Sequence, residues 1–182
     1  MKVQNRNLYR LGMILVLFSV TACIMGCSAP SFLTDLEMIV PIAGSAVAGL
    51  LALLSSVTGS GASAAASIQS IVTKVDGEFT DLNQLIASYK TNPADSTLEN
   101  IEVAVNEVVT DLKQILDIAG LPDTTSTKVN AVVQEVVGQL EAMLSVIPVL
   151  KSSTAGQTLT QVVKPVAAAT FKANIHGILG AK

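Results

Sequence analysis

Residues 96–120, STLENIEVAVNEVVTDLKQILDIAG, carry the clearest helical pattern in the chain. Apolar residues recur at steps of three and four from Leu98 to Ala119, which places them on one face of an α-helix. Ser96 and Glu99 form a capping box that predicts where the helix begins, and Gly120-Leu121-Pro122 predicts where it ends. Further apolar residues widen the stripe: Val103, Val109, Leu116 and Ile118. We therefore expect this helix to contact more than one neighbour.

Similar stripes lie on both sides of this segment. The preceding stripe consists of Ile68, Ile71, Val75, Phe79, Leu82, Ile86 and Tyr89, and the following one of Val129, Val133, Val136, Leu140, Met143 and Ile147. We expect Ser63 to cap the preceding helix and Asn92-Pro93 to end it. N-caps for the following helix are available at Asp123, Thr124 and Thr125, and we expect Pro148 to interrupt it. The short connection over residues 120–124 predicts an antiparallel helical hairpin.

The stretch from Met38 to Thr73 contains no charged residue. We expect a helix that begins at Ser31 or Thr34 and ends at the break Gly59-Ser60-Gly61. Its part from Ile39 to Val57 is long enough to span a bilayer, but a helix buried on all sides of a bundle is equally apolar. We favour the buried helix, because a span would place residues 58–73 in the cytoplasm with no Lys or Arg to hold them there. The membrane span stays open as the alternative.

These patterns predict an all-α fold, with an up-and-down bundle of about four helices over residues 31–150. Residues 151–182 are expected to form a basic helical tail. In this tail we expect a loop over Lys151–Gly156, a short helix over Thr158–Ala169 kinked at Pro165, and one or two amphipathic turns over Phe171–Leu179.

Charge is distributed unevenly along the chain. Twelve acidic residues lie between Asp76 and Glu141, whereas the charged residues after Glu141 are all lysines, accompanied by His176. We expect the basic tail to dock on the acidic bundle or to be solvated, and binding to anionic lipid is the alternative. Nucleic acid is not an expected partner of an acidic, exported chain.

The first 28 residues have the pattern of an export signal. Lys2, Arg6 and Arg10 precede the apolar run Leu11–Val20, and the segment ends in Ile24-Met25-Gly26-Cys27-Ser28. An apolar core of about 7 to 15 residues after a cationic start favours a cleaved signal over a permanent span.

This segment resembles the signal peptide of bacterial lipoproteins, in which a small residue precedes the cysteine that is lipidated. The resemblance implies a signal peptide over residues 1–26, a lipidated tether over residues 27–30 and lipidation at Cys27, with Cys23 as the alternative. Ser28 after the cysteine resembles the sorting pattern for the outer membrane, on its periplasmic face, where the source has one. Cleavage before Cys27 would leave 156 residues with eight lysines against 14 acidic residues, a net charge of about six negative.

No motif in the sequence points to catalysis or to a cofactor. His176 is the single histidine, no Glu-x-x-His pair occurs, and Gly59-Ser60-Gly61 lacks the third glycine of a nucleotide fingerprint. Carboxylates gather at Asp76, Glu78 and Asp81 and at Glu99 and Glu102 with Asn106, and we interpret both groups as solvated polar faces. We therefore expect no enzyme activity, no cofactor and no metal.

The sequence thus predicts a lipid-anchored helical protein of the bacterial cell envelope with a structural or protein-interaction role. Its expected contacts are the membrane, through the N-terminal lipid, and a protein partner or a second copy of itself. Two alternatives remain: a membrane-inserting protein of the pore-forming or holin-like kind that uses residues 38–57, and a carrier of an apolar ligand.

Overall fold

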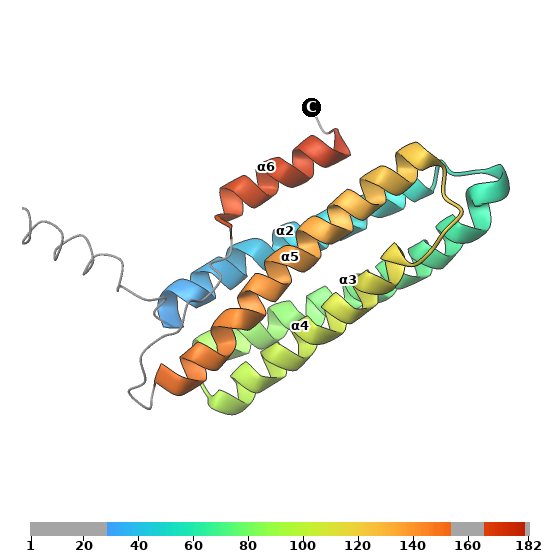
Figure 1. Ribbon diagram of the computed structural model, residues 1–182. Coiled ribbons are helices and arrows are strands. Elements are labelled where there is room, and N and C mark those ends of the chain that lie inside the picture. Colours follow the sequence, from blue (N-terminus) through green and yellow to red (C-terminus); the bar gives the residue numbers. More distant parts are fainter. Residues whose placement is uncertain (1–28, 154–165, 181–182) are drawn as a thin grey trace, which may run out of the picture.

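The computed structural model describes residues 29–153 and 166–180, and within these ranges it contains helices and no strand. The helices are α2 (Ala29–Leu54), the 3-10 turn η1 (Gly59–Gly61), α3 (Ala62–Thr91), α4 (Asp95–Leu116), α5 (Asp123–Ser153) and α6 (Ala168–Leu179). The helices α2 to α5 lie side by side along one long axis, and α6 lies over α2 and α5 (Figure 1). The predicted all-α class is confirmed.

The four long helices close into an up-and-down bundle. Each helix packs on the one before it, and α5 returns to pack on α2. The core between them is continuous and consists almost entirely of aliphatic side chains; its aromatic members are Phe79 and Tyr89 of α3 and Phe171 of α6. Valine lowers helix propensity slightly, so burial in this core, rather than local preference, holds the valine-rich helices α4 and α5 in place.

The uncharged helix α2 packs against α3, α5 and α6. Its buried residues follow the helical period: Leu36, Ile39, Val40, Ala43, Ala46, Val47, Leu50 and Leu54. Glycines let two neighbours approach closely, because a Cβ on Gly44 would lie 3.5 Å from Phe79 of α3 and one on Gly49 would lie 3.3 Å from Leu179 of α6. The prediction of a helix buried on all sides was wrong in one respect, since an outer strip with Met38, Pro41 and Ser45 stays exposed.

Two helices in the described ranges are long and apolar enough to cross a membrane, namely Leu33–Leu54 and Asp123–Pro148. Both contribute to the core, and core helices of bundles commonly reach such lengths and hydropathies. Length and composition therefore do not distinguish a buried helix from a span.

The predicted C-terminal amphipathic segment is helix α6, and it docks on the bundle. Phe171 and Ile175 are buried against α2 and α5. The backbone N–H of Val166 donates to Oε1 of the buried Gln139 of α5 at 3.1 Å, and Asn174 donates to Glu135 of α5 at 2.9 Å. Gly180 ends α6 in the left-handed conformation, with φ of 71°.

Several predicted helix ends were wrong. α2 begins at Ala29, inside the expected tether, so Ser31 and Thr34 lie within the helix. Ser63 does not cap α3, whose N-cap is Gly61 without a side-chain hydrogen bond. The capping box at Ser96 does not form either, because the N-cap of α4 is Ala94, two residues earlier, and the amides of Thr97 and Leu98 donate to the backbone carbonyl of Ala94.

Two further helix ends differ from the sequence prediction. α4 stops at Leu116, four residues before Gly120, and residues 117–122 form a loop. α5 continues through Pro148 to Ser153 instead of stopping there. The proline ring is exposed, whereas Ile147 before it and Leu150 after it are buried in the core. Burial on both sides outweighs the hydrogen bond that proline cannot donate.

Candidate functional site

A charged cluster joins α3 to α4 halfway along the bundle. The Lys74 ammonium on α3 lies 2.5 Å from Oδ2 of Asp111 on α4 and 3.4 Å from Oε1 of Glu78, one turn further along α3. The amide of Gln114 donates to Oδ1 of Asp111 at 2.9 Å. Asp111 is buried, Glu78 is mostly buried and Lys74 is exposed. The two carboxylates therefore share one cation at the edge of the core.

Burial and charge set the protonation of this cluster. Burial favours the neutral form of Glu78, and the adjacent Asp111 carboxylate reinforces this effect, so that the pKa of Glu78 rises to about 7 despite the nearby lysine. Burial also opposes ionisation of Asp111, but hydrogen bonds from Lys74 and Glu78 outweigh it and lower the pKa of Asp111. The hydrogen bond to Asp111 raises the pKa of Lys74. Near neutral pH, Glu78 is the group that exchanges its proton.

Glu78 also carries an unsatisfied oxygen. Its Oε2 is buried without a hydrogen-bond partner among the described residues. A neutral carboxyl is easier to bury in this state than a carboxylate, because the cost of losing water is far larger for the charged form. Burial of the Glu78 carboxyl thus accounts both for its unpaired oxygen and for its raised pKa.

The cluster lines a surface groove of about 580 Å³ between α3 and α4. Besides the three charged residues, its walls include the exposed side chains of Val103, Glu107 and Thr110. Val103 is 52% exposed, which is high for a large apolar side chain on a bundle of this kind. The groove combines acidic walls, one lysine and an apolar edge, and it holds no nucleophile paired with a base.

Sequence reasoning missed Asp111 and Lys74 as members of this cluster. Asp111 lies three residues after Val108 and four before Ile115, so the helical period places it on the buried stripe of α4. A carboxylate on a buried stripe predicts a partner from a neighbouring helix. That signal was present in the sequence, although it does not identify Lys74.

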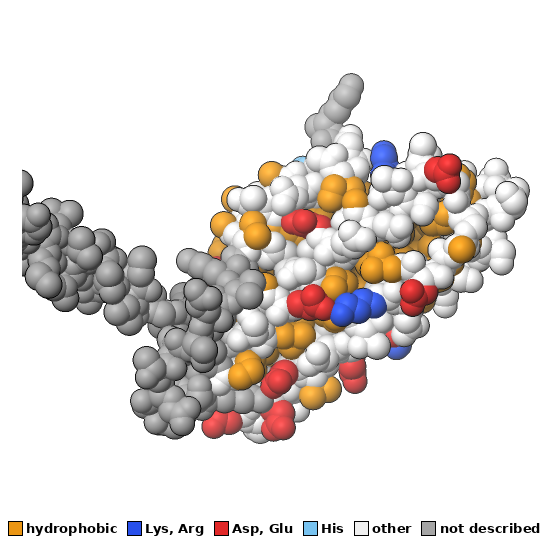
Figure 2. All heavy atoms as spheres, viewed as in Figure 1, with side chains coloured by type: hydrophobic (Ala, Val, Ile, Leu, Met, Phe, Trp, Pro, Cys, Tyr) orange, Lys and Arg blue, Asp and Glu red, His pale blue; other side chains and the backbone are white. Residues whose placement is uncertain are grey.

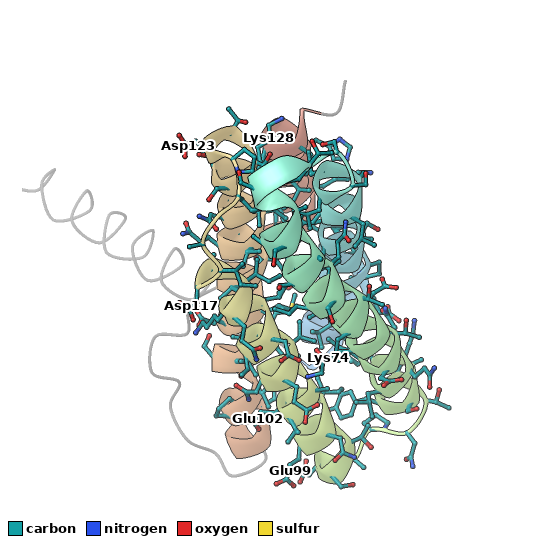
Figure 3. All side chains as sticks on the ribbon, turned by 90° about the vertical axis from the view of Figure 1, so that its right-hand side faces the viewer. Lys74, Glu99, Glu102, Asp117, Asp123 and Lys128 are labelled. Carbon is teal, nitrogen blue, oxygen red and sulfur yellow. The ribbon has the colours of Figure 1, made fainter. Side chains whose placement is uncertain are left out.

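The carboxylate groups predicted from the sequence do not come together as sites. Of Asp76, Glu78 and Asp81, only Glu78 turns toward α4, and the other two are exposed. Glu99 and Glu102 lie toward the N-terminal end of α4, whereas Lys74 lies between α3 and α4 at mid-length (Figure 3). Within residues 29–153 and 166–180, no group of three His, Cys, Asp or Glu residues could hold a metal ion.

A second, smaller groove of about 290 Å³ runs between α2 and α6. Its walls are Pro41, Ile42, Ser45 and Ala46 of α2 together with Lys172, Ile175, His176 and Leu179 of α6. Lys172 and His176 are one turn apart and exposed, so two basic side chains border an otherwise uncharged groove. His176, the single histidine, is thus exposed at the edge of an interhelical contact.

The predicted lipidation residues Cys27 and Cys23 lie outside the described residues, as do the expected signal peptide over residues 1–26 and most of the segment 151–165. In comparisons with known proteins, no family model, no curated protein and no solved structure matches this chain.

Proposed function

We propose that this chain is an exported protein, anchored through a lipid on Cys27, whose helical bundle has a structural or protein-interaction role at the bacterial cell envelope. One observation carries the proposal, namely the cationic and apolar leader that ends in Gly26-Cys27-Ser28. The fold is compatible with it, because α2 begins at Ala29, two residues after the cysteine. A lipid at that position would join the membrane directly to the first helix of the bundle.

Anchoring of this kind has a physical requirement. A single acyl chain gives marginal attachment, and two or more give stable attachment, at roughly 0.8 kcal/mol for each buried methylene. The several chains that lipoproteins of this type carry would therefore hold the bundle at the membrane without help from its own surface. The bundle is then free to present the groove between α3 and α4 to a partner.

Intact-mass spectrometry of the full chain purified from its native membrane tests the proposal. We expect a mature chain that begins at Cys27 with the added mass of a diacylglycerol group and an acyl chain. An otherwise identical sample of Cys27→Ser should lack this added mass. An unmodified wild-type chain that retains Met1 would overturn the proposal.

A second candidate function is insertion into the membrane through α2. The observation in its favour is the apolar length of Leu33–Leu54 together with the absence of charge from Met38 to Thr73. To test it, the leader is replaced by a cleaved export signal that leaves no lipidated cysteine, and the membranes are washed with alkaline carbonate. Retention of the chain in the membrane pellet supports insertion, and release into the supernatant contradicts it.

Carriage of an apolar ligand is a third candidate. It draws on the mainly apolar lining of the groove between α2 and α6. Mass spectrometry of lipid extracts from the purified protein tests it, with Ile42→Glu as the variant that should lose the ligand. Repeated preparations without bound lipid would contradict this function.

A further inference from the structure

The bundle has two electrically different sides. Acidic residues are concentrated on α3 and α4, while α6 contains no acidic residue and α2 contains none after Glu37. Acidic side chains outnumber basic ones on the face shown in Figure 2, where they lie over α4 and α5 and not over α6. Because α6 contacts α2 and α5 but neither α3 nor α4, its basic residues lie on the side opposite the acidic pair of helices.

The edge where α2 meets α6 combines basic and apolar groups. Lys172 and His176 border the groove, and Pro41, Ile42 and Leu179 line it. One turn before the groove on α2, Met38 is 44% exposed. A lysine ammonium and an imidazole N–H, both able to donate to phosphate, lie beside exposed apolar surface here and complement a phosphate group with an acyl chain beside it. This combination fits a bilayer surface better than it fits a charged protein.

Acidic groups near this edge are few. Glu37 is drawn toward α3 by its ion pair with Lys90 at 2.7 Å, and Glu135 of α5 accepts from Asn174 on the other edge of α6. Asp35 shares a face of α2 with Ile42 by helical spacing but lies almost two turns earlier. The edge from Met38 onward is therefore free of acidic residues on both of its helices.

We propose that the bundle rests on the membrane with the α2/α6 edge facing an anionic phospholipid surface, with the phosphate near Lys172 and His176 and the acyl region against the groove. This orientation rests on the proposed anchoring, and it makes that anchoring more specific. The chain enters α2 directly from the predicted anchor, so α2 is the helix that an anchor would bring to the bilayer. The acidic α3/α4 groove would then face away from the membrane.

The test measures which side of the bundle is close to lipid headgroups. A fluorophore is attached to the full, membrane-purified chain at Ser45→Cys in the α2/α6 groove, or at the exposed Thr110→Cys of the α3/α4 groove. Quenching by headgroup spin-labelled lipid is compared in phosphatidylglycerol vesicles and in phosphatidylcholine vesicles. We expect stronger quenching at Ser45→Cys, and only in the anionic vesicles.

Charge variants make the test specific. One lysine near an anionic surface contributes about fivefold to binding, so Lys172→Glu should remove the excess quenching and Lys172→Arg should keep it. Lys113→Glu on α4 is the matched control, because Lys113 is exposed and faces α5 rather than α6. Equal quenching at the two probe positions, or full quenching in Lys172→Glu, would overturn the proposal.

The same samples test the lipid anchor independently of the orientation of the bundle. In a lipidated mature chain the sulfur of Cys27 is blocked, so a chain without an introduced cysteine takes up no fluorophore. Labelling of that chain would show that Cys27 is not the lipidated residue. The difference in quenching between the two probes would still report the orientation, after the background of the native cysteines is subtracted.

Discussion

The Nζ atom of Lys74 on α3 lies 2.5 Å from Oδ2 of Asp111 on α4, and this contact joins two helices that also share a largely aliphatic core. Lys74 keeps most of its side chain in water, while Asp111 is almost completely removed from it. A buried carboxylate needs such a partner, because an unpaired buried charge is far more costly than a paired one. The nearby Glu78 then becomes the group that responds to pH.

We expect Glu78→Gln to change the pH dependence of stability. The pKa of Glu78 is about 7 in the folded chain, above the ordinary glutamate value of 4.5, so its contribution to stability is complete below pH 4.5 and is lost as the pH rises through 7. Glutamine stays neutral. The stability advantage of the variant should grow by about 2 kcal/mol between pH 5 and pH 8, since a shift of one pKa unit corresponds to about 1.4 kcal/mol.

Urea unfolding at both pH values measures this difference. Glu107→Gln is the matched control, because Glu107 lines the same groove but is exposed. We expect the control to leave the pH dependence unchanged. The same difference from wild type at pH 5 and pH 8 would contradict the raised pKa of Glu78.

Removal of the Lys74 ammonium tests whether this lysine lowers the pKa of Glu78. In Lys74→Ala, Glu78 and Asp111 face each other without the ammonium that favours their charged forms, so the pKa of Glu78 should rise above about 7. Carbon-detected NMR titration of the Glu78 carboxyl measures the midpoint. Lys90→Ala serves as the control because its lysine pairs with Glu37, away from the cluster. An unchanged midpoint in Lys74→Ala would show that Lys74 does not act on Glu78.

The sequence predicts the bundle well because buried residues recur every three or four positions along each helix. Most residues that the spacing placed on the stripes of α3, α4 and α5 are buried; the exceptions are Ile71, Leu116 and Ile118, which are partly buried, and Val103 and Ala119, which are exposed. Helix ends were predicted less well, since several side chains can cap a helix and the backbone selected other positions, as at Ala94 instead of Ser96. Pro148 shows the same limit, because a local signal to stop was overridden by burial of the residues around it.

The candidate site was harder to predict than the fold. Glu78 and Asp81 are both acidic residues on the same helix, and the sequence does not distinguish them. In the structure Glu78 turns toward α4, whereas Asp81 is exposed to water. The difference depends on the rotation of α3 against α4, which tertiary packing sets. The groove beside α6 likewise needs the docking of a segment separated from α2 by more than 100 residues.

Substitution of two glycines should have opposite effects on stability. A Cβ on Gly61 would lie 2.8 Å from Val57 and 3.0 Å from Pro122, whereas a Cβ on Gly77 of α3 would meet nothing within 4 Å. We expect Gly61→Ala to destabilise the bundle by about 1 to 3 kcal/mol through overpacking. Gly77→Ala should stabilise it by up to about 1 kcal/mol through helix propensity. Thermal unfolding of both variants measures the two changes in stability. Stabilisation by Gly61→Ala would show that Val57 and Pro122 do not pack closely against Gly61.

Substitution of Phe171 should release α6 without unfolding the four-helix bundle. Phe171 is fully buried against α2 and α5, and Phe→Ala substitutions in cores cost about 3 to 5 kcal/mol. A 12-residue helix is marginal once it loses its packing, so local opening of α6 is less costly than opening the bundle. In Phe171→Ala, amide hydrogen exchange should therefore speed up throughout α6, while α3 and α4 keep their protection.

The exposed Lys172→Ala is the control and should leave exchange unchanged. Faster exchange in all helices alike would mean that α6 and the bundle unfold as one cooperative unit.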